Sequence, residues 1–360
     1  MTDAIAGIRL TDILRVARRR EASDVHLTTG HVPGIRVDGR LESLPGAEIG
    51  ADEIRLMGTA LLDRDAIERI ETGSDISGTW SSDDIGVIRV HGYRSRNGIA
   101  LALRLLRRTI PALEALHLPA VVASFAEKQR GLIVIAGPTG SGKSTTLAGL
   151  IDRINATSAR RIITIEDPIE YRHVNKESVI SQREIGCDAH SYDSALIGAL
   201  RADPDVIVLG EMRDAGTMRT VLTAAETGHL VITTLHTGDA PQTIDRIVDA
   251  FSGTEQPQVR MQLAQALVAV VCQRLVRRAH GAGRRAVAEI LIATDGVRNM
   301  VREGRTHQLR NAMITGRQQG MQTLEHHLSA LISAQEIDRS AALAMSDRLE
   351  EVVPRVGVPA

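Results

Sequence analysis

One short stretch constrains the fold of this chain more than any other. Residues Gly137–Ser144 read Gly-Pro-Thr-Gly-Ser-Gly-Lys-Ser, which fits the phosphate-loop pattern of two glycines separated by four residues and followed by lysine and serine. An apolar run at 132–136 precedes the stretch, and a helix-like run at 145–151 follows it. The order is therefore buried strand, loop, helix, which is the context that this loop requires.

The chemistry of such a loop predicts a nucleotide ligand. Its backbone N–H groups and the positive end of the next helix point at one phosphate. Lys143 can reach the β- and γ-phosphates, and the Ser144 hydroxyl can bind Mg²⁺. We therefore expect ATP and Mg²⁺ as cofactors, with Ser144 as the metal ligand; a glycine-rich turn with a chance lysine is the alternative. The residues expected to hold the nucleotide are Gly137, Pro138, Thr139, Gly140, Ser141, Gly142, Lys143, Ser144 and Thr145.

Composition limits the classes of partner. A length of 360 residues suggests two domains, and 43% hydrophobic with 24% charged residues is ordinary for a globular protein. The net charge of −1 and the 2% of aromatic residues argue against a nucleic-acid partner, because such partners favour basic surfaces and aromatic stacking.

Two further features bear on the compartment. Cys187 and Cys272 are far apart, which argues against a metal site built from cysteines alone and favours a reducing compartment. Asp3, Arg9 and Asp12 interrupt the N-terminal stretch, so we expect no signal peptide. We also expect no membrane span, since no run reaches the ~18 apolar residues that a span needs. These features predict a cytoplasmic protein that meets a membrane only through a partner.

The first 108 residues have the pattern of a smaller α+β domain. A linker is expected at 109–119, where Pro111 and Pro119 lie, and a second domain at 120–360. The dipeptide Asn97-Gly98 predicts a hairpin, whose arginines read as solvated strand charges on composition alone. The segments with helical or strand-like spacing are Leu10–Arg20, Ala22–Leu27, Ile35–Gly39, Ile54–Ile70, Val87–Tyr93 and Ile99–Leu105.

From residue 132 onward, apolar runs alternate with helical segments, which predicts a parallel sheet. In such sheets the ligand lies outside the carboxyl ends of the strands, so the polar residues after each run are expected to converge on one nucleotide. The runs are Leu132–Ala136, Arg161–Glu166, Val206–Leu209 and Leu230–Leu235. Helical spacing is also present in Thr217–Thr227, Val259–Val276 and Arg298–Leu309.

Candidate catalytic side chains lie at these strand ends. Glu166 and Asp167 end the second run, where they can orient water around Mg²⁺ or simply cap the next segment. Glu211 follows the third run and is expected to polarise the attacking water as a general base, with an ordinary surface glutamate as the alternative. His236 follows the fourth run, near the expected γ-phosphate, whereas His229 lies at its opposite end. Both are candidates for sensing the nucleotide, with a purely structural histidine as the alternative.

Five motifs in this order resemble those of the secretion ATPase superfamily, and the match extends from about residue 11 to residue 328. A sixth stretch, Gly296–Glu303, is similar to a motif of the branch that retracts type IV pili. The resemblance implies a RecA-like P-loop NTPase domain preceded by a PAS-like α+β domain, and a homohexameric ring. The five motifs are Ala22–Leu27, Gly137–Ser144, Thr164–Glu170, Asp203–Asp214 and Thr227–Thr237.

The resemblance also implies roles for individual residues. Glu211 becomes the catalytic glutamate, Glu166 belongs to an acidic motif, and His229 and His236 form a histidine motif in which His229 contributes to nucleotide binding. Arginines of the N-terminal hairpin complete the site like arginine fingers. The implied catalytic residues are Lys143, Glu166, Glu211, His236, Arg89 and Arg104.

The implied function is a hexameric ATPase motor for type IV pilus retraction, in which pilin disassembly drives twitching motility. Its implied partners are an inner-membrane platform protein and, indirectly, pilin, at the inner face of the cytoplasmic membrane. The alternatives are a pilus-extension or type II secretion assembly ATPase, a RecA-like nucleic-acid motor, and a regulator that binds ATP without hydrolysis. The lack of a cysteine-pair zinc module favours retraction over extension.

Overall fold

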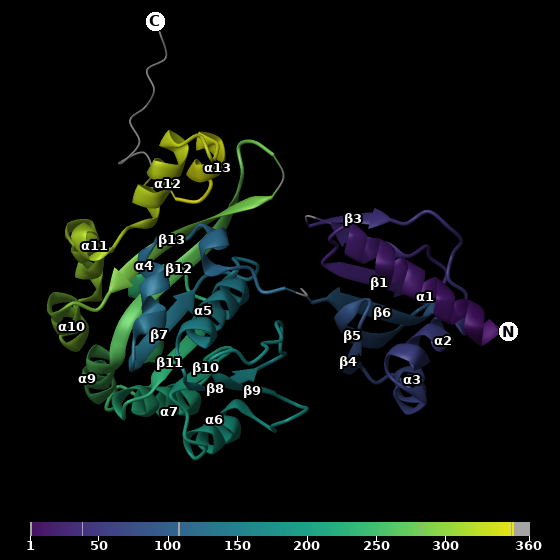
Figure 1. The fold of residues 1–360 in the computed structure, drawn as a ribbon, viewed down its shortest axis with the longest axis horizontal. Coiled ribbons are helices and arrows are strands. Elements are labelled where there is room, and N and C mark those ends of the chain that lie inside the picture. The colour runs from purple at the N-terminus through teal and green to yellow at the C-terminus, as the bar shows by residue number, and fades with distance from the viewer. Residues whose placement is uncertain (1, 38, 107–108, 282, 347, 349–360) are drawn as a thin grey trace, which may run out of the picture. The chain divides into compact units, whose positions relative to one another are not determined.

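A computed structural model describes residues 2–37, 39–106, 109–281, 283–346 and 348. The chain divides into two compact units, Met1–Thr109 and Ile110–Ala360 (Figure 1). Of the expected linker, the part after residue 109 belongs to the second unit, and the side chain of Leu113 is buried in that unit's core. None of the helices in the described part of the chain has both the length and the apolar character that a bilayer crossing requires.

The described residues of the N-terminal unit form a six-stranded antiparallel sheet in the order β3-β2-β1-β6-β5-β4. Alternate residues of β1 are buried, because one face of the sheet packs on the helices while the other is partly exposed. The strands are β1 (Asp24–Thr28), β2 (Gly34–Val37), β3 (Arg40–Ser43), β4 (Ile76–Ser82), β5 (Gly86–Ser95) and β6 (Gly98–Leu105). The helices are α1 (Thr2–Arg19), α2 (Ala51–Leu61) and α3 (Arg64–Glu71).

The C-terminal unit contains a seven-stranded sheet in the order β13-β12-β7-β11-β10-β8-β9. Of its described strands only β13 runs antiparallel to its neighbour. The four apolar runs expected to be parallel strands are confirmed as β7, β8, β10 and β11. The strands are β7 (Gly131–Ala136), β8 (Arg161–Glu166), β9 (Val179–Glu184), β10 (Val206–Leu209), β11 (Leu230–Leu235), β12 (Leu267–Arg277) and β13 (Arg284–Ile292).

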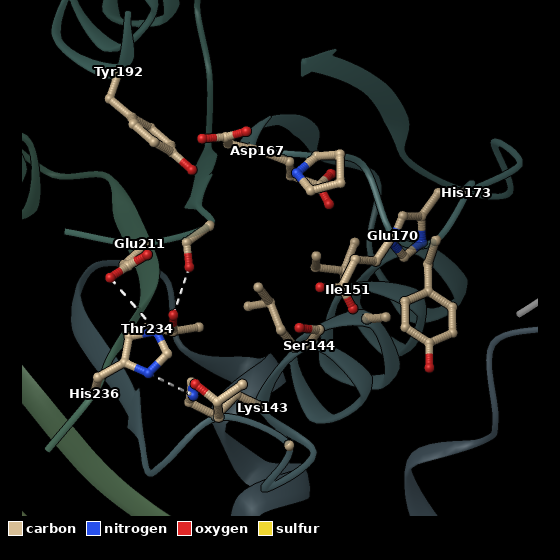
Figure 2. Close-up of a pocket in the computed structure, with 18 residues that line it drawn as sticks. Lys143, Ser144, Ile151, Asp167, Glu170, His173, Tyr192, Glu211, Thr234 and His236 are labelled. Carbon is tan, nitrogen blue, oxygen red and sulfur yellow. Dashed lines mark hydrogen bonds and ion pairs between the residues drawn. The ribbon is translucent and has the colours of Figure 1, made fainter. Parts of the chain in front are cut away.

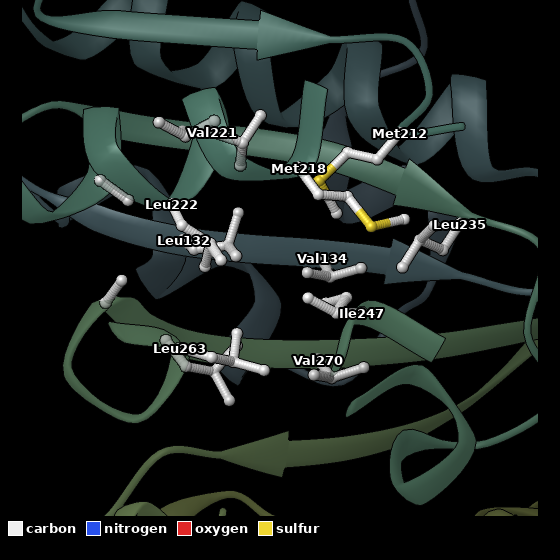
Figure 3. Close-up of a cluster of buried hydrophobic side chains, with 14 of the residues drawn as sticks. Leu132, Val134, Met212, Met218, Val221, Leu222, Leu235, Ile247, Leu263 and Val270 are labelled. Carbon is white, nitrogen blue, oxygen red and sulfur yellow. The ribbon is translucent and has the colours of Figure 1, made fainter. Parts of the chain in front are cut away.

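Helices cover both faces of this sheet (Figure 1), so its central strands are buried on both sides. Leu132 and Val134 of β7 face the core in Figure 3, whereas Ile133 and Ile135 face a second core on the other side. The helices are α4 (Val121–Ser124), α5 (Lys143–Thr157), α6 (Tyr192–Leu200), α7 (Ala215–Glu226), α8 (Ala240–Asp249), α9 (Gln256–Ala266), α10 (Asp295–Arg302), α11 (Leu309–Thr315), α12 (Leu324–Ser333) and α13 (Arg339–Leu343). Short 3-10 turns lie at Leu113–Leu116, Phe125–Glu127, Thr306–Gln308 and Arg317–Gln319.

One predicted helix is wrong. The segment Val259–Val276 is helical only as far as Ala266, and β12 begins at Leu267. Residues 267–272 are a continuous apolar run, and such a run satisfies helical spacing and strand character equally. Strand pairing decided the outcome, since β12 lies between β7 and β13. The helix expected at 298–309 likewise ends early, at Arg302.

Candidate active site

A pocket lies at the carboxyl ends of β7, β8, β10 and β11, where the sequence predicts a ligand (Figure 2). Residues from each of the four strand ends and from the phosphate loop line it, and the side chains drawn in Figure 2 surround one space. The expected site residues in its lining are Thr139, Gly140, Lys143, Ser144, Glu166, Glu211 and His236.

Two glycines of the phosphate loop are required by close approach to β12. Gly137 and Gly142 have φ angles of 143° and 90°, which disfavour residues with a Cβ. A Cβ on Gly137 would lie 2.2 Å from the backbone carbonyl oxygen of Gln273, and one on Gly142 would lie 2.7 Å from the side-chain Nε2 of the same residue. The loop therefore packs directly against Gln273.

Gln273 holds the loop at one point and the start of α5 at another, a role that sequence analysis missed. Its Nε2 donates to the carbonyl of Ser141 at 2.8 Å, and its Oε1 accepts from the Thr146 hydroxyl at 2.7 Å. The residue is only 3% exposed, so both hydrogen bonds are shielded from water. The available signal was a single amide within the apolar strand residues 267–276.

Lys143 lies at the centre of the loop. Its ammonium donates to the carbonyls of Gly137 at 2.8 Å and Pro138 at 3.1 Å, and lies 3.5 Å from Nδ1 of His236. Burial lowers the pKa of Lys143, while the nearby Glu211 and Glu170 carboxylates oppose that shift. The side chain is thus held beside the backbone N–H groups that can bind a phosphate.

Glu211 lies next to His236 in the pocket (Figure 2). Its Oε1 lies 3.5 Å from Nε2 of His236, although β10 and β11 deliver the two residues separately. The backbone before Glu211 is fixed by its neighbours, because Gly210 donates to the carbonyl of Ile165 at 2.8 Å and accepts from the Thr234 hydroxyl at 2.6 Å. Glu211 therefore projects from an anchored strand end.

Glu166, the last residue of β8, also lines the pocket. Its carboxylate accepts hydrogen bonds from the Thr164 hydroxyl at 2.7 Å and from Nε2 of Gln182 at 3.0 Å. Burial raises the pKa of Glu166, and those two hydrogen bonds partly offset the shift. The Ser144 hydroxyl lines the same pocket as Glu166 and Asp167. This set of oxygen groups fits Mg²⁺, which prefers oxygen ligands and the phosphates of a bound nucleotide.

Other expected residues lie outside this pocket. Thr145 follows the loop, and its hydroxyl pairs with the hydroxyl of Tyr171 at 2.8 Å. His229 lies at the amino end of β11, where its Nδ1 is 3.0 Å from the carbonyl of Ala224, and it is not among the described residues that line the pocket. The remaining loop residues, Gly137, Pro138, Ser141 and Gly142, surround Lys143 or line a second hollow on the far side of the loop.

The two expected arginines belong to the N-terminal unit. Arg89 of β5 and Arg104 of β6 are directly paired in register, and Nε of Arg104 lies 3.0 Å from Oδ1 of Asp24. Both arginines line a hollow in this unit together with Ser77 and His91. Their contact with ATP stays a prediction.

Comparison with known proteins identifies the family. The family model described as type II/IV secretion system protein matches residues 3–351. The chain belongs to this family.

Two curated relatives are similar over most of their length. The twitching motility protein of Neisseria gonorrhoeae is 41% identical, over 89% of this chain and 86% of its own. The type IV pilus retraction ATPase PilT of Pseudomonas aeruginosa is 38% identical, over 92% of this chain and 96% of its own. A crystal structure of the pilus retraction motor PilT with bound ADP superposes with a TM-score of 0.86 at 39% identity, covering 94% of this chain and 97% of PilT. The fold class implied by the resemblance, a RecA-like ATPase domain after a smaller α+β domain, is confirmed.

Proposed function

We propose that this family member is an ATPase that powers type IV pilus retraction, and with it twitching motility. The observation that carries the proposal is the meeting of Lys143, Glu211 and His236 in one pocket at the strand ends. The similarity to PilT supports the biological role, because that protein is a retraction ATPase and was solved with ADP.

In the proposed mechanism each side chain acts on the triphosphate or on the attacking water. The loop N–H groups and Lys143 bind the β- and γ-phosphates, and Ser144 would hold Mg²⁺, which would neutralise part of their charge. Glu211 accepts the proton of the water that attacks the γ-phosphorus. His236 lies between Lys143 and Glu211. It hydrogen-bonds the γ-phosphate and so senses whether that phosphate is present. The buried Glu166 would help to order the water around the metal.

The proposal extends to the assembly. We infer a homohexamer in which Arg89 and Arg104 reach a nucleotide and neutralise charge in the transition state, and in which His229 contributes to nucleotide binding. The ring would act at the cytoplasmic face of the inner membrane, on a platform protein and so indirectly on pilin. Four carboxylates, Glu166, Asp167, Glu170 and Glu211, line the pocket, which supports a need for further cations around ATP.

Turnover by purified variants of the full chain tests the enzymatic part. Glu211→Ala is expected to lower kcat by about 100- to 10,000-fold, the range for a general base, while nucleotide binding persists. Lys143→Ala is expected to abolish both binding and turnover. Circular dichroism checks that each variant is folded. Near-normal turnover by Glu211→Ala would show that this carboxylate is not the base.

A deletion strain tests the direction of the motor. Excess pili without twitching supports retraction, whereas cells without pili support extension. Turnover that rises strongly with added DNA would instead indicate a nucleic-acid motor. A wild-type protein that binds ATP without hydrolysing it would indicate a regulator.

A further inference from the structure

Arg213 lies two residues after Glu211 and makes three contacts around it. Its Nε is 3.0 Å from Oε2 of Glu211, Nη1 is 3.4 Å from Oδ2 of Asp167, and its Cζ lies 5.8 Å from the ring centroid of Tyr192. These partners come from the ends of β10 and β8 and from the start of α6. One guanidinium thus joins three separate elements at the rim of the pocket.

We propose that Arg213 is a positioning residue, which holds the Glu211 carboxylate in place for hydrolysis by joining it to Asp167. Arg213 is not among the described residues that line the pocket, so it acts through Glu211 and not by touching phosphate. The inference rests on the proposed ATPase function.

The backbone around Arg213 is fixed on both sides. Met212 is buried in the core shown in Figure 3, and its N–H donates to the carbonyl of Thr234 at 3.3 Å. Asp214 caps α7, accepting from the Thr217 N–H at 2.9 Å. A free arginine side chain has many rotamers. Here the ring of Tyr192 and the two carboxylates contact the guanidinium and so restrict the rotamers of Arg213.

Electrostatics gives Glu211 a reason to need this partner. Asp167 and Glu211 line the same pocket, and a bound triphosphate adds further negative charge. The planar guanidinium of arginine can contact two carboxylates at once, which a lysine ammonium does less well. Without Arg213 the Glu211 carboxylate is repelled by both, and a displacement of about 1 Å is enough to cost on the order of 100-fold in rate.

The test compares Arg213→Gln with Arg219→Gln in the full-length protein. Arg219 is a matched control, because its side chain is 53% exposed against 54% for Arg213. It also pairs with a carboxylate, Glu255 at 2.6 Å, and lies over an aromatic ring, Phe251 at 5.1 Å. Arg213→Gln is expected to lower kcat by about 10- to 100-fold with KM for ATP nearly unchanged, whereas Arg219→Gln keeps wild-type kinetics. Both should melt close to the wild type, since exposed ion pairs add little stability.

Two more variants separate positioning from a general effect. Arg213→Lys should recover part of the lost kcat, and Asp167→Asn should lower kcat without adding to the loss in Arg213→Gln, because the two residues act as one unit. Turnover of Arg213→Gln within about twofold of wild type would overturn the inference. A rise in KM at constant kcat would also overturn it, since that result indicates direct phosphate binding. An inactive wild-type protein would overturn both the inference and the proposed function.

Discussion

The two sheets of this chain differ in where their polar side chains lie. In the N-terminal sheet, charged and polar residues such as Asp24, His91 and Arg104 stand on one face of antiparallel strands. In the C-terminal sheet, both faces of β7, β10 and β11 are buried, so functional side chains lie at the strand ends. When both faces of a sheet are covered, functional side chains can reach a ligand only from the ends of its strands. The buried strands β10 and β11 hold Glu211 and His236 at two neighbouring strand ends.

The largest expected difference between the sheets is in packing. Ile133→Ala in β7, where the side chain is fully buried, should reduce the free energy of unfolding of the C-terminal unit by about 2 to 5 kcal/mol. Ser77→Ala on the partly exposed face of β4 should change the N-terminal unit by less than about 0.5 kcal/mol. Hydrogen exchange measures each unit separately, which is necessary because two units need not unfold together. Equal effects at the two sites would break the comparison.

The next prediction concerns Glu289, a carboxylate on a strand face that is covered. It accepts the Ala240 N–H at 2.8 Å, and burial, aided by Asp239 and Glu325, raises its pKa from 4.5 to about 7. Between these pH values the unfolded chain releases the proton while the folded chain keeps it, so the free energy of unfolding falls as pH rises. This decrease in the free energy of unfolding levels off above pH ~7, at about 3 kcal/mol.

Glu289→Gln keeps the acceptor oxygen but cannot ionise. The variant should therefore match the wild type near pH 4.5 and become progressively more stable than it toward pH 8, as urea titrations at several pH values would show. Glu177→Gln, at an exposed position of the same C-terminal unit, is the control for the loss of a carboxylate that is not buried. A pH-independent difference would mean that Glu289 does not titrate in this range.

A smaller effect is expected at Gln273, which connects the phosphate-binding residues to the buried strand β12. Gln273→Ala removes the hydrogen bonds to Ser141 of the phosphate loop and to Thr146 of α5, which should cost about 1 to 3 kcal/mol of stability and raise KM for ATP. Thermal melting and steady-state kinetics measure the two effects. If neither changes, the loop is held by the backbone alone.

Only a small effect on stability is expected at Arg104, whose side chain is 68% exposed. Arg104→Gln should change the free energy of unfolding by less than about 1 kcal/mol, because its ion pair with Asp24 is screened by water. Turnover should nevertheless fall if the proposed contact with ATP exists. Urea unfolding and an ATPase assay separate the two properties, and unchanged turnover would remove Arg104 from the proposed site.

Local patterns predicted the parts of the site that depend on neighbouring residues in the sequence. The loop at Gly137–Ser144, the acid at Glu211 and the histidine at 236 each follow an apolar run, and parallel pairing alone brings such ends together. Gln273 and Arg213 could not be found this way. Their partners lie on other strands or helices, and their positions are decided by pairing between elements.

The same limit explains the errors in secondary structure. The sequence predicts helix for the first residues of β12, because a continuous apolar run does not determine which strand it pairs with. The strand β9 was missed because it lies at the edge of its sheet and is only partly buried. Similarly, β3 is a short edge strand with mostly exposed residues, so it has little of the apolar alternation that marks a half-buried strand.

The hydrogen bonds of the Gln273 amide have a consequence for how a nucleotide would leave the pocket. Because the amide ties Ser141 of the phosphate loop and Thr146 of α5 to β12, any movement of the loop away from β12 would break these hydrogen bonds. A bound nucleotide can therefore leave at lower cost if groups outside the loop move and the loop itself stays in place.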